Sequence, residues 1–161
     1  MDSLENLISD NEGNHLLVAL DFYDDEYKMR YLHIPEEFAE VEVADISIEK
    51  NILDRPLNYR AFSRLTGWLL QQFDAHPDAI FTFICSIDPI QTRHHDILPQ
   101  EYRWRLFDTL FLRAMALRPY SDIMIQDVII GPEGFQSFGR AFYRMRHSPL
   151  IHLIASHLRD K

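Results

Sequence analysis

The segment that most constrains the fold is "AIFTFICSI", residues 79–87, a nearly continuous apolar run rich in strand-forming residues. Such a run is typical of a central strand that is covered on both faces of its sheet. It lies between two segments with helical periodicity, 53–78 and 99–117. The sequence therefore predicts a central strand flanked along the chain by two helices.

The two flanking helices are predicted from the spacing of their apolar residues. The first is expected to begin after a possible N-cap at Asn58 and to end at "HPD", residues 76–78. The second is expected to end at "RPYSD", residues 118–122. Their apolar stripes are Phe62, Leu65, Leu69, Leu70 and Phe73 in the first helix, and Trp104, Phe107, Phe111 and Met115 in the second.

The N-terminal third is dominated by alternation of polar and apolar residues, which is typical of strands. We expect a frayed start over 1–13, a strand from His15 to about Phe22, and a hairpin partner in "YKMRYLHIP", residues 27–35. A third strand is predicted within 36–51, with a bulge where the parity changes between Val43 and Ile46.

The C-terminal third predicts a second hairpin over 122–146 around "GPEG" and then a short terminal helix over 149–161. A helix over 135–146 is the rival interpretation, but Gly139 and the turn signal disfavour it. Ser148 is the predicted N-cap, with Pro149 at the first helical position. The expected order is β-β-β-α-β-α-β-β-α, a single α+β domain over 1–161 with a largely antiparallel sheet.

Composition places the chain among cytosolic proteins. The 161 residues contain 47% hydrophobic residues, which is ample for one core. A single cysteine cannot form an internal disulfide, and the acidic start "MDSLENLISDNEGN" does not resemble a signal peptide. Because no apolar run approaches the roughly 20 residues needed to cross a bilayer, we expect a soluble, cytoplasmic protein without membrane contact.

The net charge of −9 is distributed unevenly. Residues 1–54 carry 15 acidic against 3 basic residues, whereas residues 55–161 carry 10 against 13. Because an acidic surface repels nucleic acid at long range, nucleic acid is not an expected partner. The asymmetry predicts a protein partner instead, or a homodimer in which acidic and arginine-rich regions meet.

The stretch "FICSIDPIQTRHHD" holds the lone cysteine, Cys85, close to His94 and Asp96. These residues could form a nucleophile with its base and orienting acid, or three ligands of a metal ion. However, the apolar surroundings of Cys85 favour a buried, unreactive thiol. No second Cys or His pair completes a familiar metal site. The favoured interpretation is a buried strand that runs into a polar loop, with no metal and no cofactor.

Other chemistries find less support. The chain has no G-x-S-x-G elbow, P-loop or dinucleotide fingerprint. An anion site is conceivable because Arg140, Arg144 and Arg146 share one strand face if 137–146 is extended, with His147 beside them. Arg103 and Arg105 alternate with aromatic residues, but those aromatics fit the core stripe of a helix better than a platform for bases.

Two segments resemble a bacterial family of uncharacterised proteins. "FTFICSIDPIQTRHHDILPQEYRWRLFDTLF" is similar to the strand, polar loop and helix of that family, and "YRMRHSPLIHLIASHLRD" to its closing strand and proline-initiated helix. The hairpin "IMIQDVIIGPEGFQSFGRAFY" lies between them in the same order. The resemblance covers about half of the chain and implies no activity, so it transfers no functional residues.

The element order is also similar to the core of the GCN5-related acetyltransferase fold. That family carries a Q/R-x-x-G-x-G/A signature whose amides hold the cofactor pyrophosphate. The matching segment here, "EKNILDRPLNYRAFSR", contains no glycine and includes Pro56. The resemblance leaves Arg55 and Arg60 as the candidates for a phosphate contact. It implies an acetyltransferase-like member that has lost, or never had, acetyl-CoA binding.

The sequence therefore predicts a non-catalytic binding or interaction domain. The alternative is an atypical acyl-CoA-dependent N-acyltransferase with a V-shaped cleft between the third and fourth predicted strands.

Overall fold

The structure is a computed structural model that describes residues 2–9, 15–51, 59–84, 122–131 and 137–160, together with 109 and 112. Side chains are described over these residues except at 15, 48–51 and 59–62. The strands are β1 (Asp2–Ser9), β2 (His15–Phe22), β3 (Glu42–Asn51), β4 (Ala79–Ile84), β5 (Ile123–Ile130) and β6 (Ser137–Arg144). The helices are α1 (Asp25–Arg30), α2 (Tyr59–Ala75) and α4 (Ile151–Arg159), with 3₁₀ turns η1 (Glu36–Phe38) and η2 (Met145–Leu150).

The strands form one six-stranded sheet in the order β1-β2-β3-β4-β6-β5. Of its pairs, only β3 with β4 is parallel, and α2 connects these two strands. The expected α+β class with a largely antiparallel sheet is therefore confirmed. No helix in the described ranges is long and apolar enough to cross a membrane.

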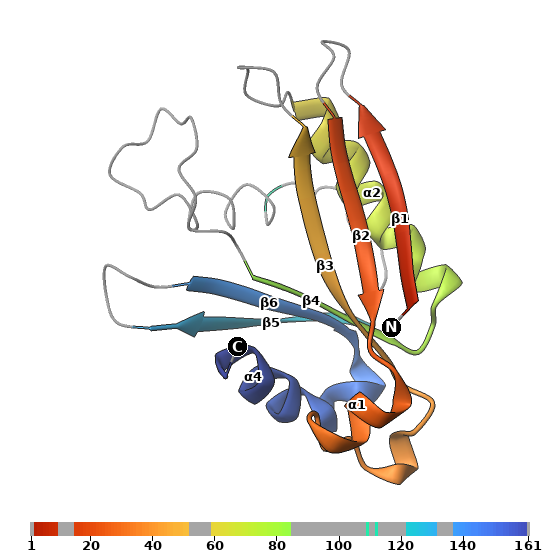
Figure 1. Ribbon diagram of the computed structural model, residues 1–161, viewed down its shortest axis with the longest axis vertical. Coiled ribbons are helices and arrows are strands. Elements are labelled where there is room, and N and C mark those ends of the chain that lie inside the picture. The colour runs from red at the N-terminus through yellow and green to blue at the C-terminus, as the bar shows by residue number, and fades with distance from the viewer. Residues whose placement is uncertain are drawn as a thin grey trace.

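The sheet has two halves that part between β3 and β4. Among the described residues, these strands pair from Glu42 opposite Ala79 to Asp45 opposite Thr82, and the rest of β3 pairs with β2. In Figure 1, β1–β3 stand together in front of α2, whereas β4, β6 and β5 run in a different direction above α4. The last paired residues of β3 and β4 thus lie where the two halves meet.

The two halves are covered on opposite faces. Helix α2 packs Leu65, Leu69 and Phe73 against one face of the sheet, and α4 packs Ile151 and Ile154 against the other. Strand β4 is buried on both faces, because Phe81 belongs to the α2 cluster and Ile80 to the α4 cluster. The predicted central strand is confirmed over 79–84, whereas 85–87 lies outside the described residues.

The predicted frayed start is wrong over 2–9. These residues form β1, which pairs antiparallel with β2 from Asp2 opposite Phe22 to Ser9 opposite His15. Ile8, only 5% exposed, anchors the strand in the core beneath α2. The strand is stabilised by its ladder of backbone hydrogen bonds, although its side chains are mostly polar and exposed.

The predicted hairpin over 15–35 is also wrong after β2. Residues 25–30 form α1, because Asp24 is an N-cap whose carboxylate accepts the Tyr27 N–H at 2.8 Å. Tyr27 and Tyr31, four residues apart, pack with ring centroids 4.8 Å apart. Lys28 is buried and donates to the Val41 carbonyl at 2.7 Å.

The predicted bulge in the third strand is absent, because the register of β2 with β3 is continuous through Ala44, Asp45 and Ile46. Val43 faces the α4 cluster and Ala44 the α2 cluster. The apparent break in parity therefore reflects burial on both faces of the sheet, which requires no extra residue.

The C-terminal predictions are largely confirmed. Strands β5 and β6 form the second hairpin, and Gly131, with a φ of 94°, begins its turn in a conformation that favours glycine. The rival helix is excluded over 137–144. The terminal helix forms but begins later than predicted, because Leu150 is the N-cap of α4. Ser148 instead lies in η2, where its hydroxyl donates to the Met145 carbonyl at 2.6 Å.

Helix α2 confirms the first helix of the sequence analysis, including its end before "HPD". The second predicted helix lies outside the described residues except for Thr109 and Leu112, which are both helical.

Candidate functional site

The residues singled out from the sequence as catalytic or cofactor-binding candidates lie almost entirely outside the described residues. This holds for Cys85, His94, Asp96 and Arg55. Arg60 lies in the first turn of α2, but its side chain is outside the described part. Whether these groups converge stays a prediction. Among the residues that the structure does describe, no group of three or more His, Cys, Asp or Glu side chains could hold a metal ion.

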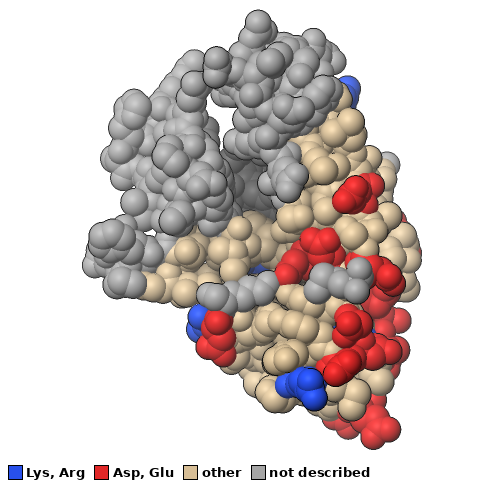
Figure 2. All heavy atoms as spheres, viewed as in Figure 1, with Lys and Arg blue, Asp and Glu red and all other residues tan. Residues whose placement is uncertain are grey.

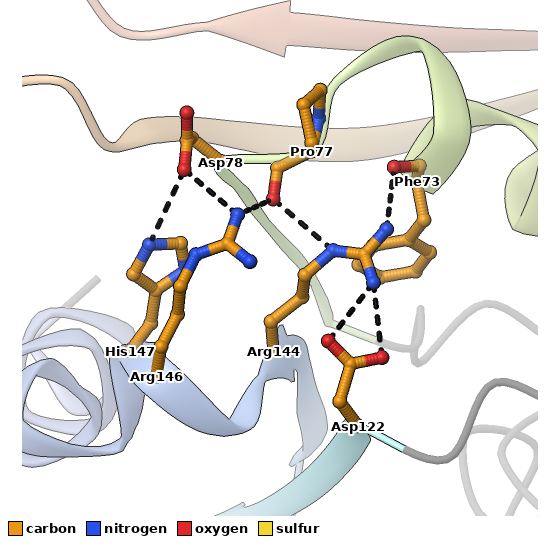
Figure 3. A network of polar contacts seen from close by, with 7 residues as sticks. All are labelled: Phe73, Pro77, Asp78, Asp122, Arg144, Arg146 and His147. Carbon is orange, nitrogen blue, oxygen red and sulfur yellow. Dashed lines mark hydrogen bonds and ion pairs between the residues drawn. The ribbon is translucent and has the colours of Figure 1, made fainter.

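Arg144, at the end of β6, is the centre of a polar network that joins this strand to the end of α2 and to the turn before β4 (Figure 3). Its guanidinium donates to both carboxylate oxygens of Asp122 at 3.0 Å. It also donates to the carbonyls of Phe73 at 2.8 Å and Pro77 at 3.1 Å. Since Phe73 lies in the last turn of α2, Arg144 caps the C-terminal end of that helix.

Arg146 and His147 extend this arginine network to the turn before β4. Arg146 donates to the Asp78 carboxylate at 2.8 Å and to the Pro77 carbonyl. His147 Nε2 lies 3.9 Å from the same carboxylate, and its Nδ1 atom is buried without a hydrogen-bond partner. Burial and the adjacent Arg146 lower the pKa of His147, so the neutral imidazole is favoured.

Arg140 is engaged within the hairpin. It is 2% exposed and donates to the Asp127 carboxylate at 2.6 Å, directly across the β5–β6 pair. Arg140 and Arg144 share a face of β6, as predicted, but Arg146 lies beyond the strand in η2. Because all three side chains contact aspartates of the same chain, they do not form the open anion site that the sequence suggested.

A second polar cluster lies where β3 and β4 part. Tyr23 and Thr82 both donate their hydroxyls to the Asp45 carboxylate, Thr82 at 2.5 Å. His157 of α4 places Nε2 3.5 Å from the Tyr23 hydroxyl. Burial and the bond to Asp45 raise the pKa of the Tyr23 phenol well above its usual range. The phenol therefore stays protonated, and the two hydroxyls fix the orientation of the carboxylate.

The sequence analysis did not find this tyrosine–carboxylate cluster. Its members are 22, 37 and 134 residues apart in sequence, so no local spacing indicates that they meet. Their position is set by the sheet register, since Asp45 and Thr82 are the last paired residues of β3 and β4.

The third feature is a large acidic surface. In Figure 2, carboxylates gather over β1–β3 and over α1 and η1, where cations are few. We define this acidic surface by the exposed residues Glu5, Asp24, Asp25, Glu26, Glu36, Glu37 and Glu40. Within the described part of the chain, its ion pairs are made by α1 itself, Lys28 with Asp25 at 3.0 Å and Arg30 with Glu26 at 3.5 Å.

Comparison with known proteins finds no protein family whose model matches the chain, and no match among curated proteins.

Proposed function

We propose that the chain is a non-catalytic binding domain for a basic protein partner. The observation that carries the proposal is the unequal use of charge. Arg140, Arg144 and Arg146 contact aspartates of the C-terminal part, whereas the acidic surface has few cations among the described residues. An exposed single-sign surface steers oppositely charged partners and raises their association rate.

The same observation weighs against a homodimer that would use the arginines of β6 and η2. A homodimer in which acidic and arginine-rich regions meet would need free arginines on the surface. Arg140 and Arg144 are 2% and 12% exposed at the side chain and are bonded to Asp127 and Asp122. Arg146 is half exposed but bonded to Asp78. These three residues have little capacity left for a neighbouring subunit.

The test is affinity capture followed by reconstitution. The immobilised chain is loaded with cell extract at low salt and eluted with a salt gradient, and each eluted protein is purified and measured again in isolation. We expect a basic protein whose dissociation constant rises with salt, since exposed charges are screened over about 8–10 Å at physiological ionic strength. Purified binders that are acidic or insensitive to salt would contradict the proposal. Sedimentation of the chain alone tests the homodimer.

We further propose that the sheet corresponds to that of the acetyltransferase fold. Three features support this: the parallel β3–α2–β4 unit, the β5–β6 hairpin that returns antiparallel to β4, and the parting of β3 from β4. The third feature also favours a second candidate function, acyl-CoA-dependent N-acyl transfer. Beyond Asp45 and Thr82, the described residues of the two strands no longer pair with each other. Strands that diverge in this way can accommodate an extended, amide-bearing ligand between them.

The missing glycine signature weighs against this second function, because Pro56 removes a backbone amide where the family holds pyrophosphate. A thermal-shift titration with acetyl-CoA and CoA tests whether the chain binds CoA species. ATP serves as the control, because it is an anionic nucleotide without the acyl-carrying part. Ligand at 100 times its dissociation constant stabilises a fold by about 2.7 kcal/mol, equivalent to roughly 5–10 °C for a chain of this size.

If CoA species shift the melting temperature and ATP does not, Arg55→Ala and Arg60→Ala should reduce the shift, and exposed Arg159→Ala should leave it unchanged. Equal shifts of the melting temperature with acetyl-CoA, CoA and ATP, or no shift with any of them, would contradict the acyltransferase function.

A further inference from the structure

Strand β5 is one of the two edge strands of the sheet. Its whole length pairs with β6, and within the described ranges no strand pairs with its other side. Val128 packs against Ala155 and Leu158 of α4, which lies against the β5–β6 hairpin (Figure 1). Because β5 is held by both β6 and α4, its outer edge has a fixed, extended conformation.

The hydrogen-bond pattern determines which backbone groups lie on this outer edge. Continued by one residue, the β5–β6 register places Asp122 opposite Met145, and the Met145 N–H donates to the Asp122 carbonyl at 2.7 Å. Hydrogen-bonded and non-hydrogen-bonded pairs alternate along an antiparallel ladder. The even-numbered residues of β5 therefore bond to β6, whereas the N–H and C=O groups of Ile125, Asp127 and Ile129 point away from it.

One of these outward groups accepts a hydrogen bond from a side chain of β5 itself. The Gln126 amide donates to the Asp127 carbonyl at 2.9 Å. Gln126 is exposed, so its amide supplies to this carbonyl the donor that a neighbouring strand would supply within a sheet. The contact agrees with the outward direction of the carbonyl, since β6 lies on the other side of the strand.

The side chains of β5 lack the features that usually block an exposed edge. Edge strands are commonly protected from pairing by charged residues, prolines or bulges. At the opposite edge, β1 carries the exposed carboxylate of Glu5. The only charged residue of β5, Asp127, is bonded to Arg140 across the hairpin, whereas Met124 and Ile129 are 38% and 54% exposed. The edge is therefore largely apolar and nearly neutral.

A second copy of β5 fits this edge. A two-fold axis at Gln126, perpendicular to the sheet, places Ile125 opposite Asp127 of the partner subunit. It also places Ile123 opposite the partner's Ile129, so that an exposed aliphatic side chain of each strand is covered. In this register the outward groups of both strands pair, and the two Asp127 carboxylates do not face each other.

The charge distribution also favours a second copy at this edge. Two copies with a net charge of −9 repel each other. The acidic surface lies over β1–β3, α1 and η1 (Figure 2), whereas β5 is at the other end of the strand order from β1. Contact through β5 therefore keeps the acidic edges of the two sheets apart. A basic partner finds little charge complement at β5, because Asp127 is already bonded to Arg140.

We infer that β5 is a self-pairing edge, through which two copies of the chain join their sheets into one continuous sheet across a two-fold axis. The inference does not depend on the proposed function, and it leaves the acidic surface accessible to a basic partner. Because one pair of strands is a small interface, we expect a dissociation constant on the order of 10–100 μM.

The test combines sedimentation equilibrium of the full chain with amide hydrogen exchange measured by NMR, at about 1–500 μM protein. The chain should pass from monomer to dimer over this range. The N–H groups of Ile125, Asp127 and Ile129 should then exchange about fivefold more slowly at ten times the dissociation constant, because only the monomer exposes them. The N–H groups of Gln126 and Val128, which bond to β6, are the internal control and should change little.

Two variants block the edge without removing a hydrogen bond to β6. Ile129→Pro deletes an outward N–H, and proline is tolerated at an edge position whose N–H faces solvent. Gln126→Lys places two like charges face to face at the axis. Each should raise the dissociation constant at least about tenfold.

The matched controls keep either the N–H group or the position of the edge unchanged. Ile129→Ala retains the N–H and should weaken the dimer less than Ile129→Pro does. Gln71→Lys adds the same charge at an exposed position of α2 and should leave the dissociation constant unchanged. Far-ultraviolet circular dichroism checks that every variant folds.

Salt distinguishes this dimer from one in which acidic and arginine-rich regions meet. Added salt should leave the β5 dimer unchanged or strengthen it, because screening reduces the repulsion between acidic copies, whereas a charge-paired dimer weakens. A chain that stays monomeric up to about 500 μM, a dimer that dissociates in salt, or one that neither Ile129→Pro nor Gln126→Lys weakens would overturn the inference. Slow exchange at Ile125, Asp127 and Ile129 in the monomer would also overturn it, since the chain itself would then cover the edge. Capture of a basic protein is measured separately, so either result can fail without the other.

Discussion

The arginine network and the acidic surface differ in whether their charged side chains have partners of opposite charge within the chain. Arg144 and Arg146 of the network, like Arg140 of the hairpin, each have an aspartate partner in the C-terminal part of the chain. On the acidic surface, Glu36 and Glu37 have no ion pair within the described residues. The two ion pairs found there, Lys28 with Asp25 and Arg30 with Glu26, lie within the short helix α1.

This difference changes the meaning of the charge asymmetry in the sequence. Two segments of opposite net charge suggest two surfaces that attract each other. In the fold, however, Arg144 and Arg146 join β6 and η2 to the end of α2 and the turn before β4. The negative excess is left on the outside. Internal ion pairs therefore support structure around Arg144 and Arg146, whereas most carboxylates of the acidic surface have no ion pair among the described residues.

The largest loss of stability is expected on substitution of Arg144. Arg144→Ala removes a side chain that is 12% exposed and leaves Asp122 and the Phe73 carbonyl without this donor, whereas the Pro77 carbonyl keeps its hydrogen bond from Arg146. We expect the free energy of unfolding to fall by about 2–3 kcal/mol, less than for a fully buried pair because Asp122 is partly exposed. Urea denaturation monitored by circular dichroism measures this loss.

Arg30→Ala is the matched control, because Arg30 also has a carboxylate partner but is 67% exposed at the side chain. Its removal should cost no more than about 0.5 kcal/mol. Equal losses in the free energy of unfolding for the two variants would show that the arginine network stabilises the fold no more than an exposed ion pair does. The contrast between the network and the acidic surface would then be wrong.

A smaller effect is expected at His147, whose pKa in the folded protein is lowered mainly by burial. The groups that face it are Arg146 and Arg144, which oppose protonation, and Asp78 and Glu40, which favour it. Because the unfolded chain binds a proton more readily near pH 6.5, acid shifts the equilibrium toward unfolding. The stability contributed by neutral His147 is present above about pH 6.5 and is lost as the pH falls from there toward the lower folded-state pKa.

The measurement is the free energy of unfolding between about pH 8 and 5.5, a range in which carboxylates still contribute little. His147→Gln should flatten the acid slope, and His152→Gln, an exposed position on α4, should leave it as in the wild type. A slope unchanged in His147→Gln would mean that the buried Nδ1 atom is not the origin of the acid sensitivity.

The fold was predictable from sequence where local pattern and tertiary packing agree. Helix α2, strand β4 over 79–84 and the β5–β6 hairpin have strong periodicity and were predicted with nearly correct bounds. Strand β1 was missed because it is an edge strand with exposed polar side chains, so its stability comes from backbone pairing that no periodicity reports. Helix α1 was missed because alternation of Tyr27, Met29 and Tyr31 hid a six-residue helix, although Asp24 gave a usable capping signal.

The candidate sites were less predictable, because their parts meet through the register of the sheet. A correct hairpin register would have placed Asp127 opposite Arg140 and Asp122 beside Arg144, and would have shown that these arginines are engaged. The contact of Arg144 with Phe73 spans 71 residues, and that of Tyr23 with His157 spans 134. Neither leaves a local signal. The hypotheses on Cys85, His94, Asp96, Arg55 and Arg60 stay predictions.

The smallest expected effect, and the sharpest test of the other side of the comparison, is at Glu36 and Glu37. Both are exposed on η1 without an ion pair in the described chain, so the double variant Glu36→Gln, Glu37→Gln removes two charges and no internal contact. The free energy of unfolding should stay within about 0.5 kcal/mol of the wild type, and the change should be slightly stabilising at low salt because repulsion among neighbouring carboxylates is reduced. Urea denaturation at low and high salt measures both the change in the free energy of unfolding and its dependence on salt. A loss above about 1 kcal/mol would mean that these carboxylates support the fold, and the acidic surface would then resemble the arginine network rather than contrast with it.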